Sequence, residues 1–299
     1  MGRWGWVLLA ALALPALAVA KPATVRVGVY VLNLGRFDLA SGSYTVDFYL
    51  SLKSDRPVPM DEFEFMNGRA TTVDRLIDTP TEKFFRIQAS LSQNLDLRRY
   101  PFDEHLLTIE LEDKRRTVDE VVYVADQELS GVDPSVIVVG WNLSGWEAKV
   151  KAHAYEVYGE TYSRFVFGLR IQRVFLNAVI KSFLPVACML LVGFLSLLLA
   201  PDKVTTRLSL NISTLLGAVM FHVNLTNSIP PVGYLTLADR VMIATYIVLF
   251  LILLSGVAIL RWAEREDRKA QALRLYQQAL GVLPPVALGI YALVFLVPL

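Results

Sequence analysis

The sequence has very few of the residues that form covalent cross-links or metal centres. Its single cysteine, Cys188, leaves no partner for an intrachain disulfide, so the chain must be stabilised by its core alone. Cys188 lies in an apolar run, where we expect a small buried side chain. The three histidines show no metal-ligand spacing, and we expect no metal and no cofactor.

The chain also lacks a strong charge of either sign and the common catalytic motifs. Its net charge is +1, so nothing predicts a broad basic surface for nucleic acid. It has no Ser/His/Asp set, no glycine-rich phosphate loop and no internal repeat. These absences argue against an enzyme, including an enzyme anchored to a membrane.

What the chain has in abundance is apolar sequence, which makes up 54% of it and is concentrated after residue 178. A separate short stretch, residues 1–20, reads as a signal peptide. Arg3 precedes the apolar run 7–17, and the small residues 18–20 form a cleavage site. A retained anchor helix is the alternative, although the run is short and Pro15 lies near its end. Cleavage after Ala20 predicts that the following domain is exported.

Residues 21–176 read as an exported domain of short β-strands. Apolar and other residues alternate with a period of two over 24–33 and 44–53, as in half-buried strands. The other expected strands are 84–91, 106–111, 121–125, 136–139, 147–158 and 163–174. Turn-forming residues separate these runs, notably at 40–43, 54–57, 67–68 and 130–134. The pattern predicts an immunoglobulin-like β-sandwich.

Residues 177–299 read as a bundle of four membrane-spanning helices. The expected spans are 177–199, 203–228, 238–262 and 279–299. An even number of spans returns the C-terminus to the outside and places the linker 263–278 in the cytoplasm. That linker carries Arg265, Arg268, Lys269 and Arg274, in agreement with the positive-inside rule. We therefore expect a multi-pass protein of the cell (inner) membrane.

The second span carries a polar stripe that lipid does not favour. Its 23 residues from Thr205 to Asn227 extend about 35 Å, enough to cross a bilayer. One helical face carries Ser209, Ser213, Leu216, Met220, Val223 and Asn227. Hydroxyls at one end and bulky apolar groups in the middle are typical of a pore wall with a hydrophobic constriction. A helix buried in a bundle, with its serines bonded to neighbours, is the alternative.

A specific motif supports the pore interpretation. The segment 96–103, Asp-Leu-Arg-Arg-Tyr-Pro-Phe-Asp, resembles the loop of pentameric ligand-gated ion channels (the Cys-loop receptor superfamily). Gln93 and Leu107 stand where eukaryotic members have the two loop cysteines, so the chain is most similar to bacterial members without that disulfide. Similar elements follow in the family's order at 169–173, Pro185, Pro230 and 234–236. The resemblance spans nearly all of the chain after residue 20.

The resemblance implies a homopentamer whose second spans surround a central pore. The implied pore-lining residues are Thr205, Ser209, Ser213, Leu216, Met220, Val223 and Asn227. Arg207 aligns with the family's basic residue at the cytoplasmic end. Thr205 and Thr206 replace the glutamate common in cation-selective relatives, and the Pro-Ala insertion of anion-selective relatives is absent. We expect monovalent cations to permeate, with membrane lipid around the bundle.

The resemblance also implies an extracellular agonist site between subunits. Aromatic walls of this kind attract amines by cation–π interactions. The implied ligand-binding residues are Tyr49, Asp126, Gln127, Tyr155, Tyr158 and Tyr162. Ordinary packing at strand edges is the alternative for each tyrosine. The family's Trp-x-Pro element is missing before Glu64, which weakens the match of the first ligand loop. We interpret the acidic pairs Asp61–Glu62 and Glu112–Asp113 as solvated surface, with weak binding of a divalent ion as the alternative.

Finally, the resemblance implies a gating interface between the sandwich and the helices. The implied residues are Asp38, Asp96, Tyr100, Pro101, Phe102, Asp103, Arg173, Pro230 and Pro231. Asp38, Asp103 and Arg173 are expected to form a buried charge cluster, with Pro101 and Phe102 inserted against the turn at Pro230–Pro231. A purely structural docking role is equally compatible with these residues.

Two further points stay open at the level of the sequence. His222 lies in the second span off the polar face, where neutral hydrogen-bonded packing is favoured over a pH-sensing role. A non-conducting membrane receptor is the alternative function, although the short cytoplasmic linker offers no effector domain.

Overall fold

The computed structural model describes residues 21–199 and 203–296. The predicted signal peptide therefore lies outside the described residues. Within these described ranges, ten strands precede four helices. The strands are β1 (Ala23–Asp38), β2 (Ser43–Ser54), β3 (Phe63–Phe65), β4 (Gly68–Asp78), β5 (Glu82–Ser92), β6 (Glu104–Asp113), β7 (Val121–Ala125), β8 (Gly131–Val132), β9 (Trp141–Tyr155) and β10 (Glu160–Arg173).

The strands form two sheets that enclose one apolar core. The first sheet has the order β4-β5-β2-β1-β7, with β8 beside β1, and the second has the order β3-β6-β10-β9. Alternate residues of each long strand point inward, so that Val46, Phe48 and Leu50 are at most 2% exposed. The expected β-sandwich followed by four apolar helices is confirmed.

The expected strand at 136–139 is wrong, because this segment pairs with no other strand. Val136 and Val138 are buried against the core while Ile137 and Val139 are 77% and 92% exposed. The alternation in the sequence therefore reflects an extended edge that covers the core without joining a sheet. The polar strand β4 was missed for the opposite reason, since most of its side chains are exposed and show no apolar alternation.

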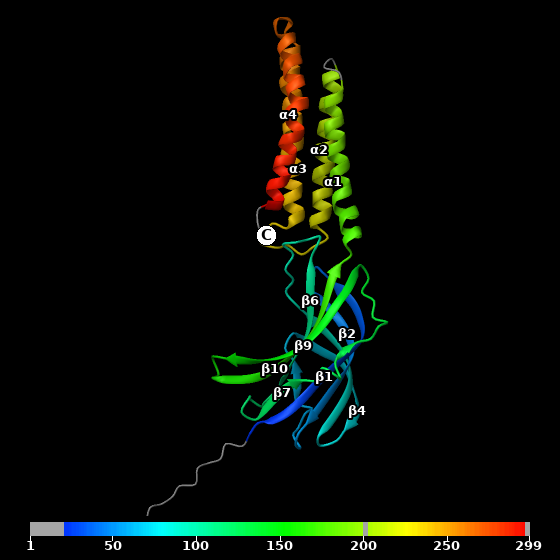
Figure 1. Cartoon of the computed structure of the whole chain (residues 1–299), viewed down its shortest axis with the longest axis vertical. Helices are drawn as coiled ribbons and strands as arrows, with labels where there is room; N and C mark the ends of the chain where they lie inside the picture. Colours follow the sequence, from blue (N-terminus) through cyan, green and yellow to red (C-terminus); the bar gives the residue numbers. More distant parts are fainter. Residues whose placement is uncertain (1–20, 200–202, 297–299) are drawn as a thin grey trace, which may run out of the picture.

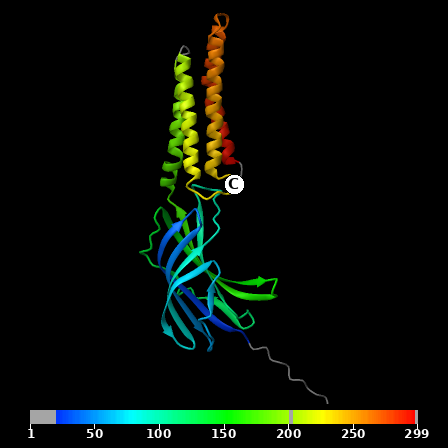
Figure 2. The same cartoon turned by 180° about the vertical axis from the view of Figure 1, so that it is seen from behind.

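The four helices are α1 (Phe175–Leu198), α2 (Val204–Thr226), α3 (Leu237–Ala263) and α4 (Lys269–Leu296), with the short 3-10 turn η2 (Glu266–Arg268) between the last two. All four are long and apolar enough to cross a membrane. Figures 1 and 2 show them side by side beyond one end of the sandwich, with the end of α4 close to the sandwich. The molecule is thus a multi-pass membrane protein with an extracellular N-terminal domain.

Two helix boundaries differ from the expected spans for local reasons. Helix α3 starts with a capping box, in which Thr236 accepts a hydrogen bond from Asp239 N (3.2 Å) and the Asp239 carboxylate accepts one from Thr236 N (2.8 Å). Helix α4 begins ten residues before the expected position 279. Residues 269–278 are rich in Ala, Leu, Gln and Arg, which favour helix, but they are too polar to register as an apolar span.

Candidate functional site

Helix α2 has two faces of opposite character. The buried stripe consists of Val204, Arg207, Asn211, Thr214, Ala218 and Leu225. The seven residues predicted to line a pore, from Thr205 to Asn227, are all exposed in the single chain and lie on the opposite face of the helix. Leu216 is 62% exposed and Met220 is 66% exposed. Serine hydroxyls on such a face require water or another chain inside a membrane.

Arg207 points away from this exposed face. Its Nε donates to the carbonyl of Ser196 (3.1 Å), and its guanidinium lies 5.2 Å from the centre of the Tyr276 ring. Its two Nη atoms are buried and have no hydrogen-bond partner among the described residues. The exposed face of α2 is therefore lined without this positive charge.

His222 lies between α2 and α3. One ring nitrogen, Nδ1, is 3.0 Å from the Tyr246 hydroxyl, and Nε2 is 3.0 Å from an Asp239 carboxylate oxygen. Asp239 also caps the first turn of α3. These contacts fit the expected packing role, because both ring nitrogens have partners within the bundle.

The hairpin between β9 and β10 forms one wall of a small cavity, and Figures 1 and 2 show this hairpin projecting sideways from the sandwich. Gly159 makes the turn with a φ of +66°, in the left-handed region that glycine adopts without strain. We call the cavity the tyrosine pocket; its volume is about 360 Å³. Its lining residues are Glu64, Glu112, Asp113, Lys114, Tyr155, Tyr158, Glu160 and Tyr162.

Hydrogen bonds tie two of the three tyrosines of this pocket to acids. The Tyr155 hydroxyl donates to Glu112 Oε2 (3.0 Å), and the Tyr162 hydroxyl donates to Glu160 Oε2 (2.9 Å). The two rings meet edge to face with centroids 5.7 Å apart. Burial and the hydrogen bond to Glu112 raise the pKa of Tyr155, so its phenol stays protonated and the acids remain the negative groups.

The interpretation of Glu112 as solvated surface is wrong. Its side chain is 2% exposed, and its Oε1 accepts a hydrogen bond from Arg164 Nε at 2.5 Å. Arg164 also pairs with Glu110 (3.1 Å). Glu110 and Glu112 are two residues apart in β6 and therefore share a face, and that spacing was the signal in the sequence.

Asp126 and Gln127 do not line the tyrosine pocket. Asp126 is buried and pairs with Arg26 (3.1 Å), while Gln127 donates to the carbonyl of Ala148 (2.9 Å). They follow β7, which pairs with β1 in the first sheet, whereas the pocket is built on the second. The pocket is instead completed by Asp113 and Lys114, at the end of β6, which pairs with β10.

Tyr49 lies in the first sheet, away from the tyrosine pocket of its own chain. Its side chain is on the outer face of β2, as its place between buried Phe48 and Leu50 predicts. Its ring stacks on Phe84 with centroids 5.2 Å apart. Within one chain, Tyr49 and the three hairpin tyrosines therefore do not form one site.

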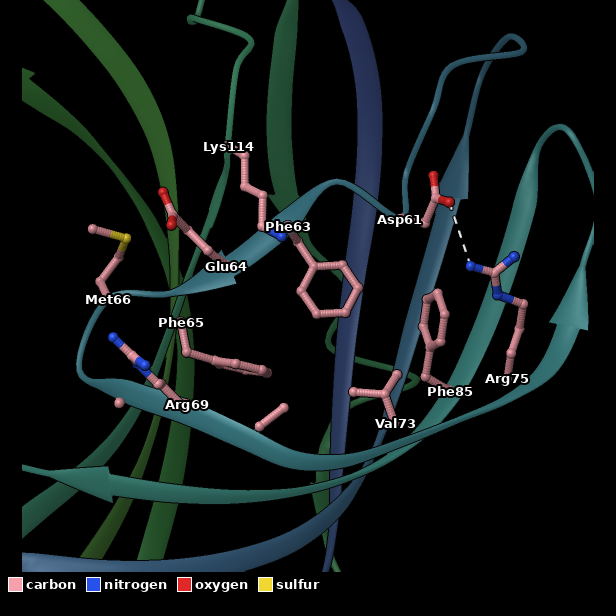
Figure 3. A pocket seen from close by; sticks show the side chains of 12 residues that line it. Asp61, Phe63, Glu64, Phe65, Met66, Arg69, Val73, Arg75, Phe85 and Lys114 are labelled. Carbon is pink, nitrogen blue, oxygen red and sulfur yellow. Dashed lines mark hydrogen bonds and ion pairs between the residues drawn. The ribbon is translucent and has the colours of Figure 1, made fainter.

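A second cavity of about 560 Å³ is lined mainly by residues of β3, β4 and β5 (Figure 3). Phe63, Phe65 and Phe85 line its apolar part, and Arg75 lies at its edge, 3.4 Å from Asp61. Glu64 and Lys114 border both this cavity and the tyrosine pocket. The two cavities are therefore neighbours at β3.

The loop from residue 93 to 103 carries a buried charge cluster at the sandwich–helix junction. Arg173 Nε lies 2.7 Å from Asp103 Oδ1, and His105 Nε2 lies 2.7 Å from Asp103 Oδ2. Burial alone would raise the pKa of the Asp103 carboxyl, but the hydrogen bonds from His105 and Arg173 outweigh it and hold that pKa below its usual range. The Arg173 guanidinium also lies 4.4 Å from the Trp141 ring centre.

The expected cluster contained Asp38, and that part of the prediction is wrong. Asp38 accepts hydrogen bonds from Ala40 N (3.1 Å) and the Ser41 hydroxyl (2.9 Å) in its own turn. Asp96 pairs with Arg98 (2.7 Å) and is also outside the cluster. His105 occupies the third place: it is the second residue of β6, and its Nε2 lies 2.7 Å from Oδ2 of Asp103, which directly precedes the strand.

The same loop packs directly on the helices. The Tyr100 hydroxyl lies 3.0 Å from the Ser228 hydroxyl, and Ala238 N donates to the Tyr100 carbonyl (3.0 Å). The Phe102 ring stacks on Phe175 and Phe183 of α1, with centroids 5.2 and 5.5 Å apart. The ring stacks of Phe102 thus lie on α1, and Tyr100 contacts Ser228 of the α2–α3 turn. The expected insertion of Pro101 and Phe102 against Pro230–Pro231 stays a prediction.

Comparisons with known proteins agree with this architecture. Residues 183–288 match the family described as the neurotransmitter-gated ion-channel transmembrane region. The chain is 23% identical over 294 residues to a proton-gated ion channel of Gloeobacter violaceus, covering 90% of this chain and 81% of that protein. These matches confirm the resemblance to the pentameric ligand-gated channels, a family of channels rather than enzymes.

The chain is also similar to subunits of animal receptors. It is 20% identical over 265 residues to gamma-aminobutyric acid receptor subunit beta-4 of Gallus gallus, covering 78% of this chain. It is 22% identical over 196 residues to a gamma-aminobutyric acid receptor subunit beta-like protein of Drosophila melanogaster, covering 63% of this chain. The chain spans 54% and 38% of these two relatives.

Proposed function

We propose that this chain, a homologue of the pentameric ligand-gated ion channels, assembles as a homopentamer around a pore formed by five copies of α2. The observation that supports this most is the exposed α2 face, which is opposite the buried stripe and carries both hydroxyls and bulky apolar side chains. A single chain in a membrane leaves Ser209 and Ser213 without water, and a ring of five gives them a water-filled axis.

The closed state is held by rings of apolar side chains in the middle of α2. Leu216, Met220 and Val223 follow one another along the exposed face and would exclude water from a narrow pore. The rings of Thr205, Ser209 and Ser213 would replace part of the hydration shell of a passing ion.

We propose that the permeating ions are monovalent cations. The described part of the exposed α2 face carries no positive side chain, because Arg207 is turned into the bundle. Hydroxyl and amide oxygens are therefore the polar groups offered to an ion on this face.

We propose that the agonist is a small amine bound in the tyrosine pocket. Tyr158 is 76% exposed and its side chain makes no hydrogen bond among the described residues, so its ring is available to a cation. Glu64 and Glu160 add negative charge, whereas Glu112 is already neutralised by Arg164. In a ring of subunits, Tyr49 of the neighbouring copy would close the pocket from its opposite side.

The channel proposal is tested by voltage-clamp recording with a screen of primary amines and a pH series. Leu216→Ala should open at lower agonist concentration, because the apolar ring that excludes water is smaller. Leu195→Ala, a 48% exposed leucine on α1, is the matched control and should behave like wild type. Reversal potentials in asymmetric salt identify the ion. Silence from both wild type and Leu216→Ala, with the protein at the cell surface, would favour the non-conducting receptor.

The ligand site is tested separately by a pair of neighbouring substitutions on the hairpin. Tyr158→Ala should raise the agonist concentration for half-maximal current by about tenfold, the order expected from loss of one cation–π contact. Val157→Ala is the control, since Val157 is 91% exposed and is not part of the pocket lining. Equal responses of the two variants would show that the amine binds elsewhere.

A further inference from the structure

The junction contains a buried histidine for which the channel proposal gives no role. His105 is 5% exposed and lies on β6, two residues after Asp103. An ionised carboxylate can only accept hydrogen bonds, so at 2.7 Å from Asp103 Oδ2 the Nε2 atom must carry the proton. The other ring nitrogen, Nδ1, has no hydrogen-bond partner among the described residues and is the position where a second proton would add.

Two charged groups, the Asp103 carboxylate and the Arg173 guanidinium, form the cluster together with His105. Asp103 directly precedes the strand of His105, and Arg173 of β10 holds the same carboxylate through two nitrogens, at 2.7 and 3.1 Å. From the other elements, Trp141 of β9 and Phe37 of β1 face the ring with centroids 5.4 and 6.4 Å away, and neither is charged.

A cavity of about 470 Å³ borders the cluster and is lined in part by Asp103 and His105. The other charged groups around this cavity are Asp96, Arg98, Arg99, Glu104 and Arg170. Asp96 pairs with Arg98, and Glu104 pairs with Arg170, both within 2.8 Å. The cavity gives a proton an aqueous route from the outside without adding an unbalanced acid beside His105.

We propose that His105 is a proton-binding site that sets the strength of the link between Asp103 and Arg173, and so makes gating depend on external pH. The regulatory part rests on the proposed channel function. With neutral His105 the cluster has one carboxylate and one guanidinium and carries no net charge. A proton on His105 leaves two cations sharing one carboxylate in a site where both Asp103 and His105 are at most 3% exposed in their side chains.

Arg173 is the member that can relieve this excess charge. Its side chain is 22% exposed, so it can turn toward water while the other two cannot. The link joins the loop that contacts the α2–α3 turn to β10, the strand that borders the tyrosine pocket. Protonation therefore weakens the path from the pocket to α2, and acid conditions should reduce the response to agonist.

The proton site is tested without any current by the emission of Trp141, because a protonated imidazole quenches an indole beside it. The purified full-length protein is titrated from pH 8 to pH 5. We expect Trp141 emission to fall, and we expect the change to be absent in both His105→Gln and Trp141→Phe. The glutamine keeps an N–H for Asp103 but cannot titrate. A change that persists in His105→Gln overturns the proposal.

The regulatory part is tested by currents evoked by propylamine over the same pH range. The half-maximal concentration should rise about five- to tenfold between pH 8 and pH 5, a usual size for coupling between sites. His105→Gln should remove this rise, while His153→Gln and His222→Gln, which complete the three histidines of the chain, should retain it. A rise that survives in His105→Gln overturns the role in gating.

The two readouts keep the proposals distinguishable. If the emission change depends on His105 but no variant conducts, the proton site is supported and the channel function fails. Size-exclusion elution and the melting temperature of His105→Gln at pH 8 should match wild type. If that variant does not fold, His105→Asn, which also retains an N–H, replaces it in both titrations.

Discussion

The ion pair between Glu112 and Arg164 gives a quantitative prediction for the wall of the tyrosine pocket. Their side chains are 2% and 11% exposed, and Glu112→Gln removes the negative charge while keeping the shape. Removing one partner of a buried pair typically costs about 3–5 kcal/mol. Arg164 retains Glu110 at 3.1 Å, so we expect a smaller loss of about 2 kcal/mol.

A loss of that size is measurable by thermal unfolding of the purified protein. For domains of this size, 1 kcal/mol shifts the melting temperature by about 2–4 °C, so Glu112→Gln should melt about 4–8 °C below wild type. Arg164→Met in the same background should recover part of the loss, because it removes the stranded cation.

The matched control is the exposed pair between Glu104 and Arg170, whose side chains are 45% and 48% exposed. Exposed pairs contribute about 0–1 kcal/mol, so Glu104→Gln should shift the melting temperature by at most about 4 °C. If Glu112→Gln and Glu104→Gln gave the same small shift, the argument that burial makes Glu112 structurally important would be refuted.

Three further outcomes are expected. Phe102→Ala removes two ring stacks on α1 and should lower the maximal agonist current with unchanged agonist binding, as measured by recording and by a binding assay. The pKa of Asp103 is lowered in the folded protein, so the ionised carboxylate contributes to stability above about pH 4. This contribution is lost as the pH falls further. The melting temperatures of wild type and Asp103→Asn should therefore converge in that acid range. Arg207→Met should leave the melting temperature unchanged or raise it, because the two Nη atoms of Arg207 are buried without partners.

The features that repeat along the chain could be predicted from the sequence. The alternation of Val46, Phe48 and Leu50 predicted which face of β2 is buried, and the apolar length of the spans predicted the four helices. The stripe from Ser209 to Asn227 predicted a face of α2 that its own bundle does not cover. Each of these features depends on the periodicity or apolar length of a single element, which can be read directly from the sequence.

The residues that depend on pairing between distant elements could not be predicted in the same way. Asp126 was assigned to the ligand site because loop order along the chain does not reveal which sheet a short strand joins. Asp38 was expected near Arg173, but its carboxylate accepts hydrogen bonds within its own turn. Aspartates followed by small polar residues often form such local hydrogen bonds. His105 was missed because its role depends on β6 and β10 lying side by side.

Strand β10 gives the two candidate sites a mechanical relationship. It runs for 14 residues, about 43 Å, from Glu160 beside the tyrosine pocket to Arg173, and α1 starts two residues later. Over most of that length it is bonded to β6 on one side and β9 on the other, so it cannot stretch. The single irregularity in its pairing with β9 lies between Arg170 and Ile171. A tilt of the hairpin end is therefore either absorbed by bending at that point or transmitted to the first turn of α1. The stiffness of the backbone at Arg170 and Ile171 thus determines how much of the motion reaches the helix bundle.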